Sequence, residues 1–439
     1  MALAGSAIGL GNIWRFPYMV GEYGGAAFII VYALCGILIS LPIMFCESVI
    51  GRRARSGVYE AFDKMVPGTP WKYFGFITVL ASFIIVSYYC VVGGWSFDYL
   101  VRSCAAGFEV TTPEQASTFF GTFASSPWEP MIAFTIFLGI SGVIVMRGVK
   151  GGIEKFTKVS TPMLFVLIVM IAIFSVSLPG AGAGVDYLLK PDFSKLTPTS
   201  VSYALGQSFF SMSLGVGCVL TYSSFMKKED SIVAAGGWTF VFDTLFALIA
   251  GFAIMPAVFS AGIEPGAGPS LVFETLPYIF AKMGAAAPIV SRIESILFFL
   301  AIFMAALTSS ISMFEVCVEH FVDRRGWSRR KASALLFICA WTLGALCCLS
   351  FGPLKDISLM GHSIFSFCDT LTSNYAMTLG ALVFSLFVGW KMDRGEVREE
   401  LTNGGTHRFS VRIFNVIHFL IKWVVPVMIL TIFLTNLFL

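Results

Sequence analysis

Two strongly apolar segments of the chain are interrupted by small and polar residues that could bind charged ligands. Gly-Leu-Gly at 9–11 and Gly-Val-Gly at 215–217 share one spacing, the first followed by Asn12 and the second preceded by several serines. Glycine in a helix interior costs about 1 kcal/mol relative to alanine. Backbone that leaves a helix inside lipid needs other hydrogen-bond partners. Such a break would present free N–H groups to an anion and free carbonyl groups to a cation.

Each glycine motif taken alone has other interpretations. Small residues also let membrane helices pack closely. The motif at 9–11 resembles the start of a dinucleotide-binding fingerprint, but Trp14 stands where the third glycine belongs and no strand precedes it. Because the motif occurs twice, five apolar segments apart, we favour two broken helices that run in opposite directions. That arrangement is typical of an inverted repeat with a binding site at its centre.

The composition of the chain is that of a membrane scaffold. Of its 439 residues, 57% are hydrophobic and only 13% are charged, whereas soluble domains carry about 25% charged residues. The net charge of +3 leaves no basic excess for nucleic-acid phosphates. The apolar runs are long enough to cross a bilayer core of about 30 Å. We therefore predict an all-α, polytopic membrane protein that lies in a lipid bilayer and binds no nucleic acid.

The apolar runs predict eleven transmembrane helices. Their ranges are 3–22, 26–51, 73–100, 130–147, 159–179, 200–225, 231–260, 289–321, 332–351, 361–391 and 412–438. Most of the 29 basic residues fall in one alternating set of loops, which the positive-inside rule makes cytoplasmic. We therefore expect a plasma-membrane (inner-membrane) protein with its N-terminus inside and its C-terminus outside.

The predicted helices form one domain made of two repeats. Residues 1–179 hold the first five helices, 200–391 hold the next five, and 412–438 form an additional helix. The first and sixth helices are the two that we expect to be broken at mid-membrane. The stretches 101–129 and 180–199 are rich in Thr, Pro, Gly and Ser and read as surface loops on the outer side.

Four segments resemble the neurotransmitter:sodium symporter family. AGSAIGLGNIWRFPY (4–18) and GEYGGAAF (21–28) resemble the region of its first helix, SFFSMSLGVG (208–217) its sixth, and AALTSSIS (305–312) its eighth. The resemblance covers essentially the whole chain and points to the bacterial branch. It implies the bacterial leucine-transporter fold, a known example of a five-plus-five inverted repeat. It also implies a sodium-coupled symporter that works by alternating access, and no enzyme.

The resemblance implies two sodium sites, and sodium as a hard cation prefers oxygen ligands. The second site would use the carbonyl groups of Gly5, Ile8 and Ala305 with the hydroxyl groups of Thr308 and Ser309. The first site would use Ala7, Asn12, Ser211 and Asp243. For the two hydroxyls of the second site, hydrogen bonding to carbonyls of their own helix is the alternative role.

Relatives in animals bind chloride beside the first sodium ion. The matching positions here are Tyr32, Gln207, Ser211 and Asp243. Because an ionisable residue inside a membrane is costly and by default functional, we expect Asp243 to supply the negative charge and transport to need no chloride. The other intramembrane acid, Glu47, is expected to satisfy the broken backbone of the sixth or first helix.

The resemblance also implies a substrate site between the broken helices. Its residues would be Ala7, Gly9, Gly11, Ile85, Tyr89, Phe210, Ser211, Ser213, Val216, Ser309 and Met313. Amine-transporting relatives carry an Asp at the position of Gly9, so Gly9 leaves room for a substrate carboxylate. Tyr89 would donate its hydroxyl to that carboxylate, although it could also be an ordinary packed aromatic beside Tyr88. The remaining lining is mostly apolar, which favours hydrophobic or aromatic L-amino acids.

Gate residues are implied in the same way. Arg15 would pair with Asp369 to close the outer side, with Phe210 as a lid, and Asp323 matches the inner-gate carboxylate. The usual arginine partner of Asp323 would lie before Met1. Eight residues precede Gly9, about 12 Å of helix, too few to reach the cytoplasmic surface. We therefore expect that a preceding segment is missing or that the start of the chain is placed late.

Other functions stay open at this point. A symporter for a biogenic amine or a betaine is the nearest alternative, and Gly9 argues against the amine. A channel would need a continuous polar pore, whereas the polar residues here cluster at the centre of the membrane. An intramembrane enzyme would need a metal or Ser-His set, and the four histidines are scattered. A transport-inactive partner protein would not need the ion-ligand positions.

Overall fold

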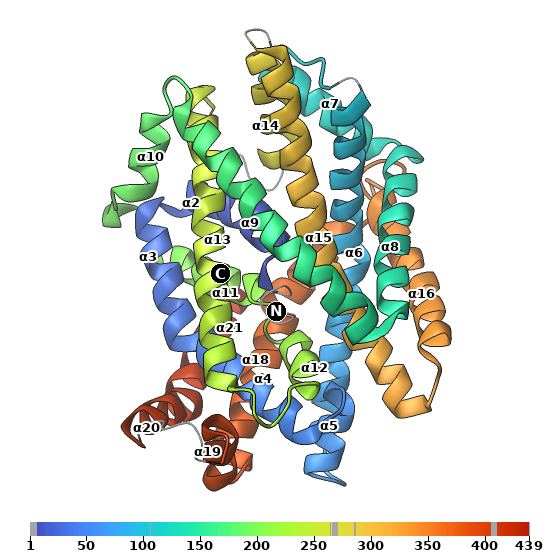
Figure 1. Cartoon of the computed structure of the whole chain (residues 1–439), viewed down its shortest axis with the longest axis vertical. Helices are drawn as coiled ribbons and strands as arrows, with labels where there is room; N and C mark the ends of the chain where they lie inside the picture. The colour runs from blue at the N-terminus through green and yellow to red at the C-terminus, as the bar shows by residue number, and fades with distance from the viewer. Residues whose placement is uncertain are drawn as a thin grey trace.

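The computed structural model is a bundle of helices, most of which run along the long axis of the molecule (Figure 1). It describes residues 7–105, 107–263, 265, 271–284, 287–404 and 411–438. Within these ranges, nine helices are long and apolar enough to cross a membrane. They correspond to nine of the eleven predicted spans, and the other two predicted spans are the interrupted ones.

The uninterrupted spans in the first half of the chain coincide with the predicted ranges to within a few residues, except that the helix of the fifth starts earlier. In chain order they are α3 (Ala26–Cys35), η2 (Gly36–Ser40) and α4 (Leu41–Ala54), then α6 (Trp71–Ala105), then α8 (Glu129–Met146), then η3 (Val149–Ile153) and α9 (Glu154–Ser177). The elements η2 and η3 are single π-helical turns that continue directly into the next helix.

The uninterrupted spans of the second half follow the same pattern. They are α13 (Ile232–Ser260), α15 (Pro288–Arg325) and α16 (Arg329–Leu349), then α17 (Ile364–Thr370), η6 (Leu371–Ala376), α18 (Met377–Leu386) and η7 (Phe387–Lys391), and last α20 (Val411–Phe419), η8 (Leu420–Val424) and α21 (Val425–Phe438).

The first and sixth spans are broken where the glycine motifs predict a break. Residues 8 and 9 leave the helical conformation, after which the chain continues as η1 (Gly11–Arg15) and α2 (Phe16–Tyr23). The sixth span is divided into α11 (Pro198–Ser211) and α12 (Cys218–Ser224), separated by six non-helical residues. The inverted repeat and the total of eleven spans remain predictions.

The predicted loops at 101–129 and 180–199 are partly helical, which corrects the expectation from sequence. They contain α7 (Pro113–Ser125), α10 (Gly182–Leu189) and the short η4 (Phe193–Lys195). Thr112 caps α7 by accepting a hydrogen bond from the Gln115 N–H at 3.3 Å, with Pro113 at the first helical position. A search for long apolar runs misses such short surface helices. They are not surrounded by lipid, so their sequences need not be apolar throughout.

The remaining short elements lie at the two ends of the bundle. They are α5 (Val58–Met65), α14 (Leu271–Gly284), α19 (Arg394–Thr402) and a hairpin of β1 (Ser358–Leu359) and β2 (His362–Ser363). Helices α7 and α14 lie at the top in Figure 1, and α5 and α19 lie at the bottom. Within the described residues, the prediction of an all-α chain is therefore correct except for this hairpin of two two-residue strands.

Helix packing depends on small residues at the crossings. A Cβ atom added to Gly94 of α6 would lie 2.5 Å from the backbone nitrogen of Phe134 in α8. Hydroxyl pairs join α15 to its neighbours, for example Ser141 and Ser310, whose oxygens are 2.8 Å apart. Both features are typical of helix packing inside membranes. This framework holds the broken spans at the centre of the bundle.

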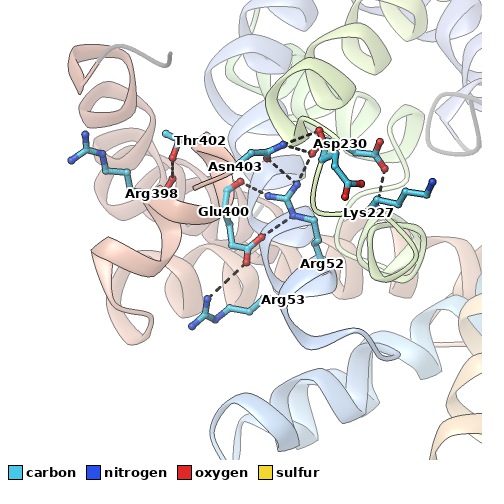
Figure 2. A network of polar contacts seen from close by, with 9 residues as sticks. Arg52, Arg53, Lys227, Asp230, Arg398, Glu400, Thr402 and Asn403 are labelled. Carbon is cyan, nitrogen blue, oxygen red and sulfur yellow. Dashed lines mark hydrogen bonds and ion pairs between the residues drawn. The ribbon is translucent and has the colours of Figure 1, made fainter. Parts of the chain in front are cut away.

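A buried arginine joins three segments at the end of the bundle that carries α19 (Figure 2). Arg52, at the end of α4, forms an ion pair of 2.8 Å with Glu400 of α19, and its side chain is 3% exposed. It also donates to the Asp230 carbonyl at 2.6 Å and to Asn403 Oδ1 at 3.0 Å. Helix α19 is thereby fixed to α4 and to the connection between α12 and α13.

Candidate functional site

The two broken spans meet at a small cavity in the centre of the bundle. The cavity measures about 20 Å³, which is room for one or two water molecules. It is lined by Ala7, Gly9, Gly11, Ile85, Tyr89, Phe210, Ser211, Ser213, Val216, Ser309, Met313 and Met377. All the residues predicted to bind the substrate are therefore brought together, from η1, α6, α11, α15 and the two breaks.

Glycines at the first break lie close to side chains of the cavity. A Cβ atom on Gly9 would lie 1.9 Å from Ser309 Oγ, and one on Gly11 would lie 3.1 Å from Phe210 Cδ1. Side chains at these positions would fill the cavity or displace its lining. The backbone of the first break is thus exposed to whatever occupies the cavity.

The break in the sixth span has a left-handed backbone. Ser213, Gly215 and Gly217 have φ angles of 53°, 78° and 79°, a region that residues other than glycine rarely adopt. The Val216 carbonyl accepts a hydrogen bond from Ser82 Oγ of α6 at 2.6 Å. One of the carbonyls that the break removes from the helix is therefore satisfied by a side chain of a neighbouring span.

Glu47 of α4 satisfies the N–H groups of the same break. Its Oε1 accepts from the Gly215 N–H at 2.7 Å and its Oε2 from the Leu220 N–H at 3.3 Å. The residue is fully buried. Of the two roles left open by the sequence, the contact present among the described residues is with the sixth span. Glu47 therefore acts as a fixed acceptor for broken backbone.

Replacing Glu47 with glutamine tests this role. The amide has one acceptor oxygen and one donor nitrogen, so one of the two N–H groups would face another donor. A buried donor left unsatisfied costs about 1–3 kcal/mol, so we expect a lower melting temperature and weaker substrate binding. Thermal denaturation of the purified variant checks this, with Glu114→Gln on the exposed surface of α7 as the control. A Glu47→Gln protein as stable as the parent would contradict the role.

Asp243 of α13 is the centre of a buried polar cluster. Its Oδ1 accepts from Asn12 Nδ2 at 2.8 Å and from Ser211 Oγ at 2.7 Å, and its Oδ2 accepts from the Tyr32 hydroxyl at 3.0 Å. All four residues are at most 2% exposed. The carboxylate and hydroxyl oxygens are hard ligands of the kind sodium prefers. Asn12 presents its Nδ2 to this cluster, and its Oδ1 accepts from the Gly9 N–H at 3.0 Å. The structure therefore brings together Asn12, Ser211 and Asp243, and the sodium ion between them remains a prediction.

Gln207 lies next to this cluster. Its Nε2 donates to the Gly11 carbonyl at 2.8 Å. Its Oε1 is buried and has no hydrogen-bond partner in the described part of the chain. Of the residues at the predicted chloride positions, Tyr32 and Ser211 bond to Asp243, whereas Gln207 bonds to the first break.

The residues predicted for the second sodium site also converge, as far as the structure describes them. Thr308 Oγ1 donates to the Ile8 carbonyl at 3.0 Å and to the Ala305 carbonyl at 2.9 Å. Ser309 follows on the same turn of α15 and faces Gly9. Gly5 lies outside the described residues. The bond from Thr308 to the Ala305 carbonyl is the hydrogen bond within its own helix that was the alternative role of this hydroxyl. The bond to the Ile8 carbonyl additionally connects α15 to the first break.

Tyr89 of α6 contacts the first break directly. Its hydroxyl oxygen accepts a hydrogen bond from the Leu10 N–H at 3.2 Å. Its side chain also interacts with that of Ser309, which lines the same cavity. Tyr88, beside it in sequence, instead donates to Asp369 Oδ1 at 3.0 Å. The two adjacent tyrosines therefore have different roles.

The predicted outer gate residues lie on the same side of the cavity but form no ion pair within the described ranges. The Arg15 guanidinium lies over the Phe210 ring, 4.5 Å from its centroid. Asp369 accepts from Tyr88 and, at 2.9 Å, from Ser373 Oγ. The pairing of Arg15 with Asp369 therefore remains a prediction for another conformation. The contact between Arg15 and the predicted lid residue is present.

The predicted inner-gate carboxylate, Asp323, lies at the opposite end of α15. Its Oδ2 accepts from the Gly57 N–H, just before α5, at 2.9 Å. The contact ties the end of α15 to α5.

Met377 lines the cavity although sequence reasoning did not find it. It begins α18, an apolar helix in which one methionine carries no distinguishing signal. Gly380, one turn later, allows the close approach, because an added Cβ would lie 2.0 Å from the Gly215 carbonyl oxygen. Gly380, as a glycine at a helix crossing, is the only feature of the sequence that could have indicated that α18 lines the cavity.

A metal-dependent enzyme site is not found in the part of the chain that the structure describes. No group of three or more His, Cys, Asp or Glu residues in those ranges is arranged to hold a metal ion.

The chain matches the family model described as "Sodium:neurotransmitter symporter family" over residues 1–116 and 115–439. It is 36% identical over 434 residues to YhdH, an uncharacterized sodium-dependent transporter of Bacillus subtilis, covering 99% of this chain and 95% of that protein. It is 30% identical over 420 residues to an uncharacterized sodium-dependent transporter of Methanocaldococcus jannaschii, covering 91% and 82%.

A similar solved structure is that of MhsT in complex with L-phenylalanine. The two chains are 38% identical and superpose with a TM-score of 0.91, over 99% of this chain and 97% of MhsT.

Proposed function

Because the chain belongs to the sodium:neurotransmitter symporter family, we propose that it carries hydrophobic or aromatic L-amino acids across the plasma membrane together with sodium. It is a membrane-spanning, sodium-dependent transporter and not an enzyme. The observation that carries the choice of substrate is the lining of the central cavity, in which the described residues include no charged side chain. The L-phenylalanine bound to MhsT supports the same class of solute.

The two breaks suit the charged groups of an amino acid. N–H groups of the first break, together with the Tyr89 hydroxyl, would bind the carboxylate. The Leu10 N–H and the Gly9 N–H would then exchange their present contacts with the Tyr89 hydroxyl and with Asn12 Oδ1 for the substrate. Carbonyl groups of the two breaks would bind the ammonium group. The substrate side chain would then face Ile85, Val216 and Met313. Gly9 supports an amino acid over an amine, because no carboxylate of the protein stands at that position to bind the ammonium group.

Sodium would bind at two positions next to the cavity. In the first, the cluster around Asp243 would supply the side-chain oxygens, and the substrate carboxylate would complete the coordination. In the second, Thr308 with the carbonyl groups of Ile8 and Ala305 would join α15 to the first break. Because Asp243 already provides a negative charge, we propose that transport is independent of chloride.

Transport by alternating access would require the central cavity to widen. A cavity of about 20 Å³ is too small for an amino acid, so its lining must move when the solute enters. Phe210, held under Arg15, is the element we assign to the outer lid. On the charge distribution of the loops, the end with α5 and α19 faces the cytoplasm.

Uptake into proteoliposomes tests the proposal. With an inward sodium gradient, we expect accumulation of L-phenylalanine, L-leucine or L-tryptophan, and none when potassium replaces sodium. The same panel includes L-glutamate, L-lysine, a biogenic amine and glycine betaine as alternative solutes. Accumulation of the amine or the betaine, with no amino acid transported, would overturn the choice of substrate. Binding of amino acids that is never followed by accumulation would instead indicate a transport-inactive protein.

A further inference from the structure

We propose that a groove at the end of the molecule that carries α5 binds an anionic phospholipid. The groove lies between α5, α6, α15 and α16 and has a volume of about 680 Å³. It shares no lining residue with the central cavity. The inference concerns a second site and does not depend on which solute is carried.

The wall of the groove is apolar and faces outward from the bundle. Phe76 and Leu80 of α6 are 48% and 44% exposed. The rest of the apolar wall consists of Val79, Phe83, Cys317, Phe321, Leu335, Leu336 and Cys339. Helices α6, α15 and α16 are all long and apolar enough to cross the membrane. The groove therefore opens to the bilayer, where the apolar molecules available to fill it are acyl chains.

Two arginines form the polar rim of the groove. Arg324 and Arg325 lie in the last turn of α15, and both are exposed. The Arg324 guanidinium lies 5.0 Å from the centroid of the Tyr59 ring, also part of the groove. Within the described ranges neither guanidinium forms an ion pair with a carboxylate. Guanidinium groups match phosphate oxygens in geometry and charge.

The position of Trp327 gives the depth of this rim in the membrane. Its ring stacks on Phe321 with a centroid separation of 5.3 Å, and Lys331 Nζ lies 4.2 Å from the ring centroid. Tryptophan and basic residues gather where membrane meets water. The rim thus lies at the level of lipid headgroups, and the apolar wall extends toward the centre of the membrane. This order matches a phospholipid with an anionic headgroup.

The positive charge of the rim favours a lipid with an anionic headgroup over a lipid without net charge. A zwitterionic lipid such as phosphatidylcholine also offers a phosphate, but its choline cation offsets that charge and brings a positive group near the two guanidinium groups. Basic pockets between transmembrane helices on the cytoplasmic side bind anionic headgroups, and on the proposed orientation this end is cytoplasmic. We therefore assign the groove to an anionic phospholipid of the inner leaflet.

Titration of the delipidated full chain in detergent tests the assignment. Native mass spectrometry would compare phosphatidylglycerol with phosphatidylcholine that carries the same acyl chains. We expect tighter binding of phosphatidylglycerol, weakened roughly tenfold by Arg324→Gln with Arg325→Gln, and unchanged binding of phosphatidylcholine. Lys227→Gln with Lys228→Gln is the control, because both lysines are exposed and lie outside the groove.

A second variant separates the acyl-chain site from surface attraction. Leu80→Trp would fill the groove from an exposed position of α6, so we expect it to weaken the binding of both lipids. The assignment is overturned if the arginine variant binds phosphatidylglycerol as the lysine control does. It is also overturned if Leu80→Trp leaves phosphatidylglycerol binding intact, which would indicate electrostatic attraction to the rim alone. Sodium-dependent uptake, measured separately, does not enter either outcome.

Discussion

Replacing Asp243 with serine is expected to reduce sodium-dependent uptake by about 100-fold or more in chloride-free medium. The carboxylate is fully buried, and three side chains donate to it. Removing one member of a buried charge pair costs about 3–5 kcal/mol, and the sodium ion proposed beside Asp243 would lose its counter-charge. Uptake by the parent protein should not change when gluconate replaces chloride.

Chloride is expected to restore much of the activity of this variant. Serine is smaller than aspartate and leaves room for an anion between the hydroxyls of Tyr32 and Ser211. Asp243→Asn removes the same charge but fills the space, so chloride should restore it far less. Asp186→Asn, which removes an exposed carboxylate of α10, is the matched control. An Asp243→Ser protein fully active without chloride would show that the charge comes from another group.

Replacing Gly215 with alanine is expected to destabilise the protein by roughly 2–5 kcal/mol. The φ angle of Gly215 is 78°, and an added Cβ would lie 2.0 Å from the Met377 carbonyl oxygen. The left-handed conformation costs an alanine about 1–2 kcal/mol, and the forced separation of α18 from the break adds about 1–3 kcal/mol. A lower yield of folded protein and a lower melting temperature would report the loss.

The same packing offers a reciprocal variant and a control. Gly380→Ala should resemble Gly215→Ala, because its Cβ would lie 2.0 Å from the Gly215 carbonyl oxygen. Gly206→Ala in α11 has no atom within 4 Å of the new Cβ and should leave stability unchanged or slightly improved, since alanine favours helix. If all three variants behave alike, the contact between the break and α18 does not limit stability.

Residues with strong local signals were predictable from the sequence. Hydropathy locates nine spans because lipid requires long apolar helices. The glycines at 9–11 and 215–217 locate both breaks, since Gly9 and Gly11 lie close to neighbouring side chains and Gly215 and Gly217 adopt positive φ angles. Family motifs then assign the cavity lining, and the structure brings those residues together.

The features of the fold and site that could not be predicted from the sequence depend on tertiary contacts or on the conformation of the protein. Met377 is one apolar residue in an apolar helix, and only the approach of Gly380 to the break makes it a wall of the cavity. Helix α7 is a surface helix set by its Thr112 cap. The pairing of Arg15 with Asp369 remains a prediction: Tyr88 and Ser373 both donate to Asp369 Oδ1, and no ion pair of Arg15 is present in the described ranges.

The arginine network of Figure 2 has a consequence for synthesis of the chain in the membrane. Glu400, which pairs with Arg52, lies 348 residues later, so at roughly 5–20 residues per second it is made about 20–70 s after Arg52. During that interval the guanidinium must remain hydrated, because an unpaired charge in a medium of low dielectric constant costs several kcal/mol. The end of the second span therefore reaches its final buried position only when α19 emerges from the ribosome, which makes this helix a late step of assembly.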